Sequence, residues 1–174
     1  MSNLDLNSID FSKLPSCGDF DFRIARDGTW FYRGSPIGRK PLVRLFSTVL
    51  RRENDGSYWL VTPVERGRIV VDDAPFVAVE MTVTGAGEEQ CLAFRTNVED
   101  WVTADAGHPI RVAYGAGGEP SPYIRVRGAL DALISRAVFY QLVDLAETRE
   151  QDGSTEMGVW SGGAYFPLGL MEAA

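Results

Sequence analysis

The chain contains few cysteines, histidines and lysines, and it has no long apolar run. Cys17 and Cys91 are its only cysteines, and they lie far apart and outside any CxxC spacing. This pattern indicates neither a disulfide framework nor a zinc knuckle, and it predicts two buried thiols in a reducing cytoplasm. Lys13 and Lys40 are the only lysines, and His108 is the single histidine, so a metal site built from several histidines is not expected.

The hydropathy and charge of the chain argue against two classes of partner. No segment approaches the roughly 20 apolar residues of a membrane span. Residues 1–10 are acidic and polar where a secretion signal needs positive charge followed by an apolar run. The net charge of −7 and the pI of about 4.7 oppose attraction to a polyanion. We therefore expect a soluble cytoplasmic protein, with neither a membrane nor a nucleic acid polymer as its partner.

Two segments of the chain have similar sequences. Residues 37–57 begin Ile-Gly-Arg and end Arg-Glu-Asn-Asp-Gly-Ser, and residues 134–154 begin Ile-Ser-Arg and end Arg-Glu-Gln-Asp-Gly-Ser, at a constant offset of 97. An internal repeat of this kind indicates one supersecondary unit used twice. The chain is therefore predicted to fold as two related halves, and the seam between them is the first place to expect a ligand.

Local patterns predict strands, then a helix, then strands in the first half. Residues 20–32 alternate apolar and charged side chains around Asp27-Gly28, which is typical of a β-hairpin. Apolar residues recur at helical spacing over residues 42–50, with Pro41 in the first helical turn. Gly56 is expected to stop this helix.

The second half repeats that order. Ser135 is expected to cap a second helix that Gly153 ends. In the N-terminal module further strands are expected at residues 58–64 and 67–71. In the C-terminal module strands are expected at residues 77–83, 91–94, 110–114 and 123–126, with a last hairpin at 158–168. The predicted fold class is α+β, with mostly antiparallel sheets and one packed helix in each half. Its parts are a leader (1–18), an N-terminal module (19–76) and a C-terminal module (77–174).

Arginines at the predicted helix starts are the main binding candidates. Arg39 and Arg136 occupy the same place in the two copies of the repeat, and Arg125 and Arg127 lie on the strand that leads to the second helix. A guanidinium group beside a helix N-terminus attracts phosphate or carboxylate through its bidentate fork and through exposed backbone N–H groups. The alternative is that each arginine pairs with an acidic residue of the protein itself.

Two aromatic residues lie beside loops rich in glycine and proline. Trp30 and Tyr123 are predicted to line a pocket, where a flat ring can stack on a base. Packing within the sheet is the alternative for both side chains.

A catalytic role has one candidate. His108 would act with Glu65 or Asp73 in a hydrolase or transferase, provided that these side chains converge within hydrogen-bonding distance. A turn or surface histidine is the alternative. The glycine runs at 85–87 and 115–118 lack the lysine and hydroxyl group of a phosphate loop. We therefore assign no catalytic residue, metal ligand or cofactor.

Several blocks of sequence together resemble a known family. They are Trp30-x-x-x-Gly34-x-Pro36-Ile37-x-Arg39, residues 58–65 (YWLVTPVE), 73–76 (DAPF), 94–97 (FRTN) and 122–128 (PYIRVRG). They resemble the proteobacterial domain-of-unknown-function family numbered 1285 over nearly the whole chain after the leader. The resemblance implies an α+β core made by domain duplication, with a C-terminal half superficially like a pleckstrin homology fold. It also implies a small, nucleotide-like ligand at the interface of the halves and a role in signal transduction.

Two hypotheses for the function follow. The first is a non-enzymatic sensor or adaptor that holds a small anionic ligand between its halves. Arg39 and Arg136 would bind the anion, Arg127 would assist, and Trp30 or Tyr123 would cover an aromatic part of the ligand. The second is a protein interaction module without a small ligand, which uses a sheet edge or a groove. An arginine-lined cleft would favour the first hypothesis, and an exposed apolar patch would favour the second.

Overall fold

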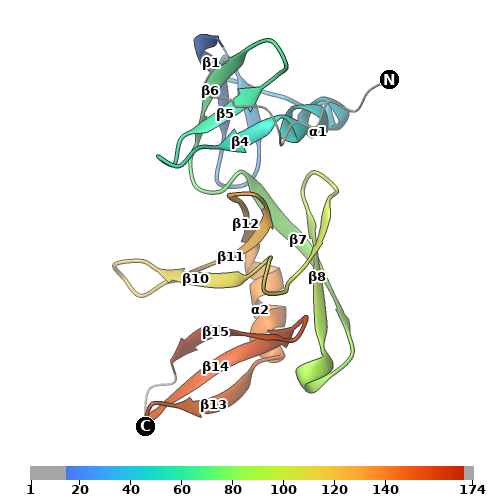
Figure 1. The fold of residues 1–174 in the computed structure, drawn as a ribbon, viewed down its shortest axis with the longest axis vertical. Coiled ribbons are helices and arrows are strands. Elements are labelled where there is room, and N and C mark those ends of the chain that lie inside the picture. The colour runs from blue at the N-terminus through green and yellow to red at the C-terminus, as the bar shows by residue number, and fades with distance from the viewer. Residues whose placement is uncertain (1–14, 171–174) are drawn as a thin grey trace. The chain divides into compact units, whose positions relative to one another are not determined.

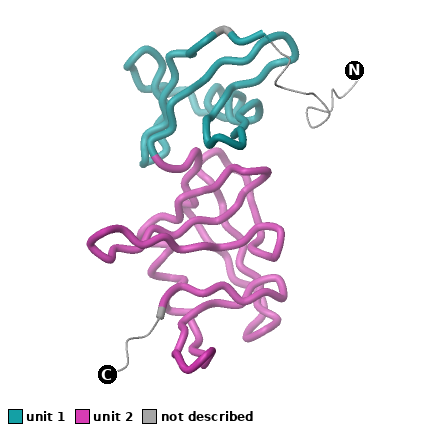
Figure 2. Tube along the Cα trace, turned by 60° about the vertical axis from the view of Figure 1, so that its left-hand side comes forward, with its two compact units in different colours: residues 1–72 teal, residues 73–174 magenta. Residues whose placement is uncertain are grey.

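The computed structural model describes residues 15–170, and the chain divides into two compact units. Unit 1 ends at Asp72 and unit 2 begins at Asp73 (Figure 2). Most of the predicted leader lies outside the described residues. The first strand already begins at Ser16, inside the segment that the sequence assigns to the leader.

Unit 1 contains a six-stranded sheet and one α-helix. Its elements are β1 Ser16–Ile24, β2 Trp30–Tyr32, β3 Ser35–Pro36, α1 Lys40–Thr48, β4 Leu50–Arg52, β5 Tyr58–Val61 and β6 Arg66–Val71 (Figure 1). The strands lie in the order β3-β2-β1-β6-β5-β4. The pair β1 and β6 is parallel and the other neighbours are antiparallel, so the sheet is mixed.

The first hairpin forms as the alternation predicts. Ile24 of β1 pairs with Trp30 of β2. In the turn between them Gly28 adopts a φ of +89°, a conformation that favours glycine. Asp27 Oδ1 accepts a hydrogen bond from the backbone N–H of Thr29 at 2.9 Å, which fixes the turn.

An aromatic cluster forms part of the core of unit 1. The ring of Trp30 stacks on Phe46 of α1 with the centroids 6.3 Å apart, and Phe22 of β1 meets Trp30 edge-on at 6.4 Å. Trp30 is only 1% exposed. Burial of these large rings is what holds α1 on the sheet, because the free energy gained scales with the apolar area removed from water.

Helix α1 is shorter than the sequence predicts. It ends at Thr48, and the chain turns at Val49 into β4, so Gly56 does not stop it. Two consecutive β-branched residues disfavour a further helical turn, and Leu50 pairs with Leu60 in the sheet. Gly56 instead adopts a φ of +86° in the turn between β4 and β5.

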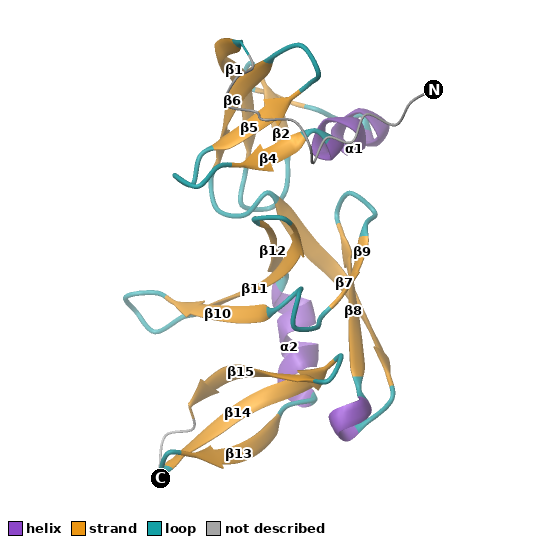
Figure 3. Ribbon diagram, in the orientation of Figure 1, coloured by secondary structure: helices purple, strands orange, loops and turns teal. Residues whose placement is uncertain are grey.

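Unit 2 contains two sheets, one α-helix and a short 3-10 turn, η3 (Gly87–Glu89). Its other elements are β7 Phe76–Thr84, β8 Cys91–Thr96, β9 Trp101–Thr103, β10 Ile110–Tyr114, β11 Pro120–Arg127, β12 Leu130–Ile134, α2 Arg136–Asp144, β13 Glu147–Gln151, β14 Ser154–Ser161 and β15 Ala164–Leu170 (Figure 3). One sheet has the order β10-β11-β12-β7-β8-β9 and the other β13-β14-β15. The pair β12 and β7 is parallel and the rest are antiparallel.

Helix α2 starts where the sequence predicts and ends earlier. Ser135 is its N-cap, and the Ser135 side chain accepts a hydrogen bond from the backbone N–H of Val138. The helix ends at Asp144 rather than near Gly153, because residues 147–151 form β13. Asp152 and Gly153 have φ of +51° and +80° and join β13 to β14, as a two-residue hairpin turn requires.

Both of the similar segments, residues 37–57 and 134–154, therefore form a helix followed by an antiparallel hairpin. These are α1-β4-β5 in unit 1 and α2-β13-β14 in unit 2. The chain is α+β, with two domains of mixed sheets and one α-helix in each among residues 15–170. The local patterns did not predict the two parallel pairings, because these join strands that are far apart in sequence. They also missed antiparallel pairings that involve the strands β4, β9, β12 and β13.

Candidate functional site

Arg125 on β11 is engaged with a buried carboxylate. Its Nε lies 2.6 Å from Asp131 Oδ1, and the Arg111 Nη2 atom lies 3.0 Å from Asp131 Oδ2. Asp131, on the neighbouring strand β12, is 5% exposed. Two guanidinium groups thus serve one carboxylate, and hydrogen bonds between charged partners fix Arg125 in the sheet.

Arg127 on the same strand also has an acidic partner. Its Nη1 atom lies 3.5 Å from Asp100 Oδ2, and its guanidinium group lies over the ring of Phe76 at 5.5 Å. Pairing with an acidic residue, which the sequence left open for each arginine, is therefore present at both Arg125 and Arg127.

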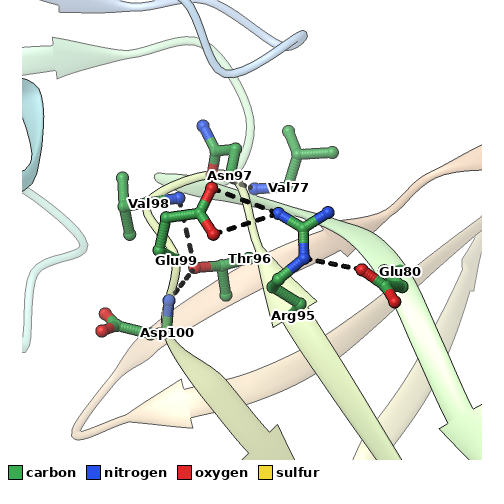
Figure 4. A network of polar contacts seen from close by, with 8 residues as sticks. All are labelled: Val77, Glu80, Arg95, Thr96, Asn97, Val98, Glu99 and Asp100. Carbon is green, nitrogen blue, oxygen red and sulfur yellow. Dashed lines mark hydrogen bonds and ion pairs between the residues drawn. The ribbon is translucent and has the colours of Figure 1, made fainter. Parts of the chain in front are cut away.

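The turn after β8 holds Asp100 in place (Figure 4). Thr96 is fully buried, and its Oγ1 accepts hydrogen bonds from the backbone N–H groups of Val98 at 3.3 Å and Asp100 at 3.2 Å. Asn97 Oδ1 accepts a hydrogen bond from the backbone N–H of Val77 at 3.0 Å. Thr96 and Asn97 of the Phe-Arg-Thr-Asn block thus have a structural role, because their side chains hold the backbone of this turn.

The arginine of that block makes a surface network beside the turn. Arg95 Nε donates to Glu80 Oε2 at 2.7 Å, and its Nη1 lies 3.2 Å from Glu99 Oε1 (Figure 4). All three side chains are partly exposed, so we expect the network to contribute little to stability.

The two aromatic candidates are both buried. Trp30 lies in the aromatic cluster of unit 1, and Tyr123 is 8% exposed. The Tyr123 hydroxyl donates to Asp73 Oδ1 at 2.6 Å, and the Arg111 guanidinium covers its ring at 4.3 Å. Stacking on a ligand needs an accessible ring face. Both rings therefore pack within their own units, which is the alternative that the sequence left open.

Arg136 opens helix α2 and is exposed. Its Nε donates to the hydroxyl of Tyr140 at 2.7 Å, and its guanidinium group lies over the Tyr140 ring at 5.6 Å. Because this hydroxyl is neutral, the positive charge of Arg136 is not compensated by it.

Arg39 occupies the N-cap of α1 without capping it. Its backbone is extended (φ −90°, ψ 99°), and its side chain makes no cap hydrogen bond. Lys40 and Arg44, which lie four residues apart, are also exposed, and the first turn holds no acidic residue. Among residues 15–170 no carboxylate lies within ion-pair distance of any of these three side chains, which we name the basic cluster.

The basic cluster is electrostatically unfavourable for the helix that carries it. A cation at the positive end of the helix dipole costs roughly 0.3–1 kcal/mol, and like charges four residues apart cost a few tenths more. Pro41 also lacks a backbone N–H, so an anion at this end of α1 would depend on side chains. The sequence analysis included Arg39 among the binding candidates and missed Lys40 and Arg44. Their four-residue spacing and the lack of an acidic residue in the first helical turn are both visible in the sequence.

Charge is divided unequally between the two units. Residues 1–72 contain 11 Lys and Arg against 9 Asp and Glu, a net charge of +2, and residues 73–174 contain 6 against 15, a net charge of −9. The total of −7 therefore conceals a basic unit 1. The negative charge of the whole chain therefore does not exclude an anionic partner for unit 1.

His108 has a different partner from those predicted. Its Nδ1 lies 2.9 Å from Asp105 Oδ1, and this side-chain hydrogen bond lowers the pKa of Asp105 below its ordinary value. Asp73, also in unit 2, accepts a hydrogen bond from the Tyr123 hydroxyl. The partner of His108 within unit 2 is therefore Asp105, and the two residues close a local turn in which they also form a backbone bridge.

Two further findings concern metals and membranes. Within residues 15–170 no group of three or more histidine, cysteine, aspartate and glutamate side chains is placed to hold a metal ion. In the same part of the chain neither helix has the length and hydrophobicity needed to cross a bilayer.

Comparisons with known proteins agree with the motif blocks. The model of the N-terminal domain of the domain-of-unknown-function family DUF1285 matches residues 9–74, and that of its C-terminal domain matches residues 75–168. A crystal structure of a DUF1285 family protein from Silicibacter pomeroyi DSS-3 is 54% identical, with a TM-score of 0.85, and covers 91% of this chain and 85% of its own. A second, from Shewanella baltica OS155, is 25% identical, with a TM-score of 0.56, over 71% of this chain and 91% of its own. No curated protein matches the chain.

Proposed function

We propose, for a chain that belongs to the DUF1285 family, a non-enzymatic role as a binding module for a small anionic ligand, with the basic cluster as its site in unit 1. The observation that carries this proposal is that Arg39, Lys40 and Arg44 gather at the positive end of α1 without a carboxylate among residues 15–170. This arrangement lowers helix stability, and a bound anion would remove that cost. Local violations of this kind are expected at functional sites.

The chemistry of the cluster suits phosphate or carboxylate. The guanidinium group of Arg39 can form two parallel hydrogen bonds to either anion, and Lys40 adds a compact charge with three donors. Arg136 is the second anion-binding candidate, because its partner Tyr140 is uncharged. Arg125 and Arg127 already serve carboxylates of unit 2, so we give them a supporting role.

We extend the proposal to the class of ligand, the role and the location of the protein. A nucleotide-like ligand and a role in signal transduction come from the family resemblance. A cytoplasmic location is supported by the scarcity of cysteine. None of these requires the protein to catalyse a reaction.

Thermal unfolding of the full chain with added anions tests the site. We expect ATP, pyrophosphate or inorganic phosphate to raise the melting temperature and adenosine to leave it unchanged, since binding to the folded state alone stabilises it by about 2.7 kcal/mol at 100 times Kd. In Arg39→Glu the ligand-dependent rise should disappear, while the melting temperature without ligand stays the same or increases slightly. An acidic residue at this helix end is favourable.

Arg33→Glu is the matched control, since Arg33 is an exposed arginine of unit 1 outside α1. Arg33→Glu should retain the ligand-dependent rise in melting temperature. The variant Arg136→Glu tests separately whether Arg136 binds the anion. If none of the three anions raises the melting temperature of the natural chain, the proposal fails. If Arg39→Glu loses stability equally with and without ligand, Arg39 has a structural role instead.

A protein partner is the second candidate, supported by one observation. Leu45 is 61% exposed on α1, beside Arg44 of the basic cluster. An exposed leucine next to cations suits an acidic, amphipathic partner segment better than a small anion. Leu45→Ser should leave the anion-dependent stabilisation unchanged. Loss of that stabilisation would assign Leu45 to the small-ligand site.

We also propose that the two units arose by duplication. Its support is that α1-β4-β5-β6 and α2-β13-β14-β15 both consist of a helix followed by three consecutive antiparallel strands, where the sequence repeats at an offset of 97. The pleckstrin-like character of the C-terminal half is supported by six strands that precede α2. Superposition of the two segments at the offset of 97 tests the common origin, and opposite strand order or handedness would exclude it.

A further inference from the structure

A groove of about 680 Å³ runs along β1 and β6 on the sheet of unit 1. It arises where the two parallel strands fall out of register, because β1 takes seven steps from Ser16 to Arg23 while β6 takes four from Arg66 to Val70. Bulges of this kind bend a strand away from its partner and are common beside functional sites. A smaller hollow of about 200 Å³ shares two lining residues with the groove and reaches Phe31 and Gly34.

The groove contains charged side chains of both signs that form no ion pair among residues 15–170. Asp19 and Asp21 of β1 line it, and neither carboxylate forms a hydrogen bond or ion pair with another residue in the range 15–170. Arg68 of β6 lines it as well, and no described carboxylate lies within ion-pair distance of its guanidinium group. The pKa of Asp55 is lowered mainly by hydrogen bonds from Ser57, and the charge of Arg68 adds to this shift from a longer distance. Asp19 and Arg68 are register partners on the two strands, yet they do not pair with each other.

Arg23, the fourth charged residue of the groove, differs from these three. Its Nε lies 3.0 Å from Asp72 Oδ1, and its guanidinium group covers the ring of Phe31 at 5.7 Å. This ion pair raises the pKa of Arg23 through the hydrogen bonds to Asp72. Arg23 therefore already has an acidic partner, whereas Asp19, Asp21 and Arg68 form no ion pair within residues 15–170.

Apolar groups complete the lining. The ring of Phe20 lies against Gly67, where a Cβ atom would overlap it, and Ile69 is buried beneath the groove. Val70 lines it with 59% of its surface exposed. The site thus combines apolar surface with a few polar groups, as small-molecule sites of 300–1,000 Å³ generally do.

We propose that this groove binds a small zwitterionic molecule of amino-acid or dipeptide size. Its ammonium group contacts Asp19 and Asp21, and its carboxylate contacts Arg68 through a bidentate hydrogen bond. A simple anion would meet the two carboxylates, and a simple cation would leave the Arg68 guanidinium group without a partner, so a ligand with both charges is the most complementary. The site involves none of the basic cluster, and it stands independently of the anion-binding proposal.

Calorimetric titration of the full chain with dipeptides provides the test. The probes are alanyl-alanine, alanyl-leucine and alanyl-phenylalanine, each compared with its N-acetylated form and its C-terminal amide. We expect saturable binding of at least one free dipeptide, and at least tenfold weaker binding of both blocked forms, because each blocked form loses one charge. If none of the free dipeptides binds, or if blocking has no effect, the proposal is overturned.

Charge-neutralising variants assign the two ends of the ligand. Arg68→Gln should remove the preference for a free carboxylate and retain the preference for a free amino group, whereas the double variant Asp19→Asn and Asp21→Asn should do the opposite. Circular dichroism confirms that each variant is folded, and the single variant Asp21→Asn replaces the double one if that does not fold. Arg44→Gln and Asp144→Asn, in the two helices, should bind dipeptides like the natural chain. Arg44→Gln should nevertheless weaken phosphate binding, so the two proposals can fail separately.

Discussion

The Nε atom of Arg125 lies 2.6 Å from Oδ1 of Asp131, and this carboxylate is almost completely buried between adjacent strands. The pair shows how unit 2 uses its arginines, since a second guanidinium group, that of Arg111, contacts the other carboxylate oxygen. A buried charge is tolerated only with partners of this kind. The arginines that remain uncompensated are consequently the better binding candidates.

Replacing Asp131 with alanine should destabilise the protein by about 1–3 kcal/mol, because two charge-assisted hydrogen bonds are lost. Both arginines are partly exposed and can regain water, which keeps the loss below that of a fully buried pair. Urea unfolding measures the difference. Asp144→Ala, at the exposed end of α2, should change the free energy of unfolding by less than about 0.5 kcal/mol, and an equal loss there would refute the role of Asp131.

Ser135→Ala should destabilise unit 2 by about 1 kcal/mol, because the hydrogen bond that the Val138 N–H donates to the Ser135 hydroxyl oxygen is the side-chain cap of α2. Arg39→Ser offers the complementary test in α1, where the extended N-cap lacks a side-chain hydrogen bond. It should stabilise the protein by several tenths of a kcal/mol while weakening phosphate binding. Thermal melts with and without phosphate measure both effects, and a destabilised Arg39→Ser variant would show that the natural arginine supports the helix.

Gly56→Ala should destabilise the protein by about 1–2 kcal/mol, because this residue has a φ of +86° that a Cβ atom disfavours. Gly38→Ala is the control. Gly38 lies outside the positive-φ region, and a Cβ atom there would contact nothing within 4 Å. It should be neutral or slightly stabilising because it restricts the unfolded chain. Denaturant midpoints that fall equally in both variants would contradict this explanation.

The turn at Asp105 should make a pH-dependent contribution to stability. Its Oδ1 accepts hydrogen bonds from the backbone N–H groups of Gly107 and His108, and the side-chain hydrogen bond with His108 is the main cause that lowers the pKa of Asp105. A carboxyl group with a lowered pKa stabilises the folded state above its unfolded pKa and loses this effect as the pH falls through the folded pKa. The loss should therefore begin near pH 4, the ordinary range for aspartate.

Melting temperatures of the natural chain and Asp105→Asn, measured from pH 7 to pH 3, check this expectation. The natural chain should melt higher at neutral pH, and the difference should shrink from about pH 4 downward as Asp105 takes up a proton. A difference that stays constant over the whole range would show that the carboxylate charge does not contribute.

Much of the local structure could be predicted from residues that are close in sequence. The alternation around Asp27-Gly28 predicted the first hairpin, and Ser135 predicted the start of α2, because turns and caps depend on a few neighbouring residues. The predicted C-terminal ends of both helices were wrong, and the cause also lies in local sequence signals. Gly56 and Gly153 lie in hairpin turns, but a glycine that follows a helical pattern also predicts the end of a helix, so the two cases cannot be told apart from the sequence.

The candidate site was less predictable than the fold. Arg39 and Arg136 were identified from the repeat, but nothing in the sequence separates them from Arg125, whose partner Asp131 becomes adjacent only when β11 and β12 pair. Trp30 and Tyr123 are amphipathic, and only the packing around them shows that both are buried.

The α+β class and most of the strands could be predicted from the sequence, because they follow from periodicity and turn chemistry over short windows. The family was identified from the resemblance of several motif blocks. Tertiary structure alone decided that β1 pairs in parallel with β6 and loses register beside Asp19 and Arg68, and that some arginines are neutralised while others are not. The physical reason is that a charge acquires its partner from the strand packed beside it, and that strand is chosen by burial of the whole core.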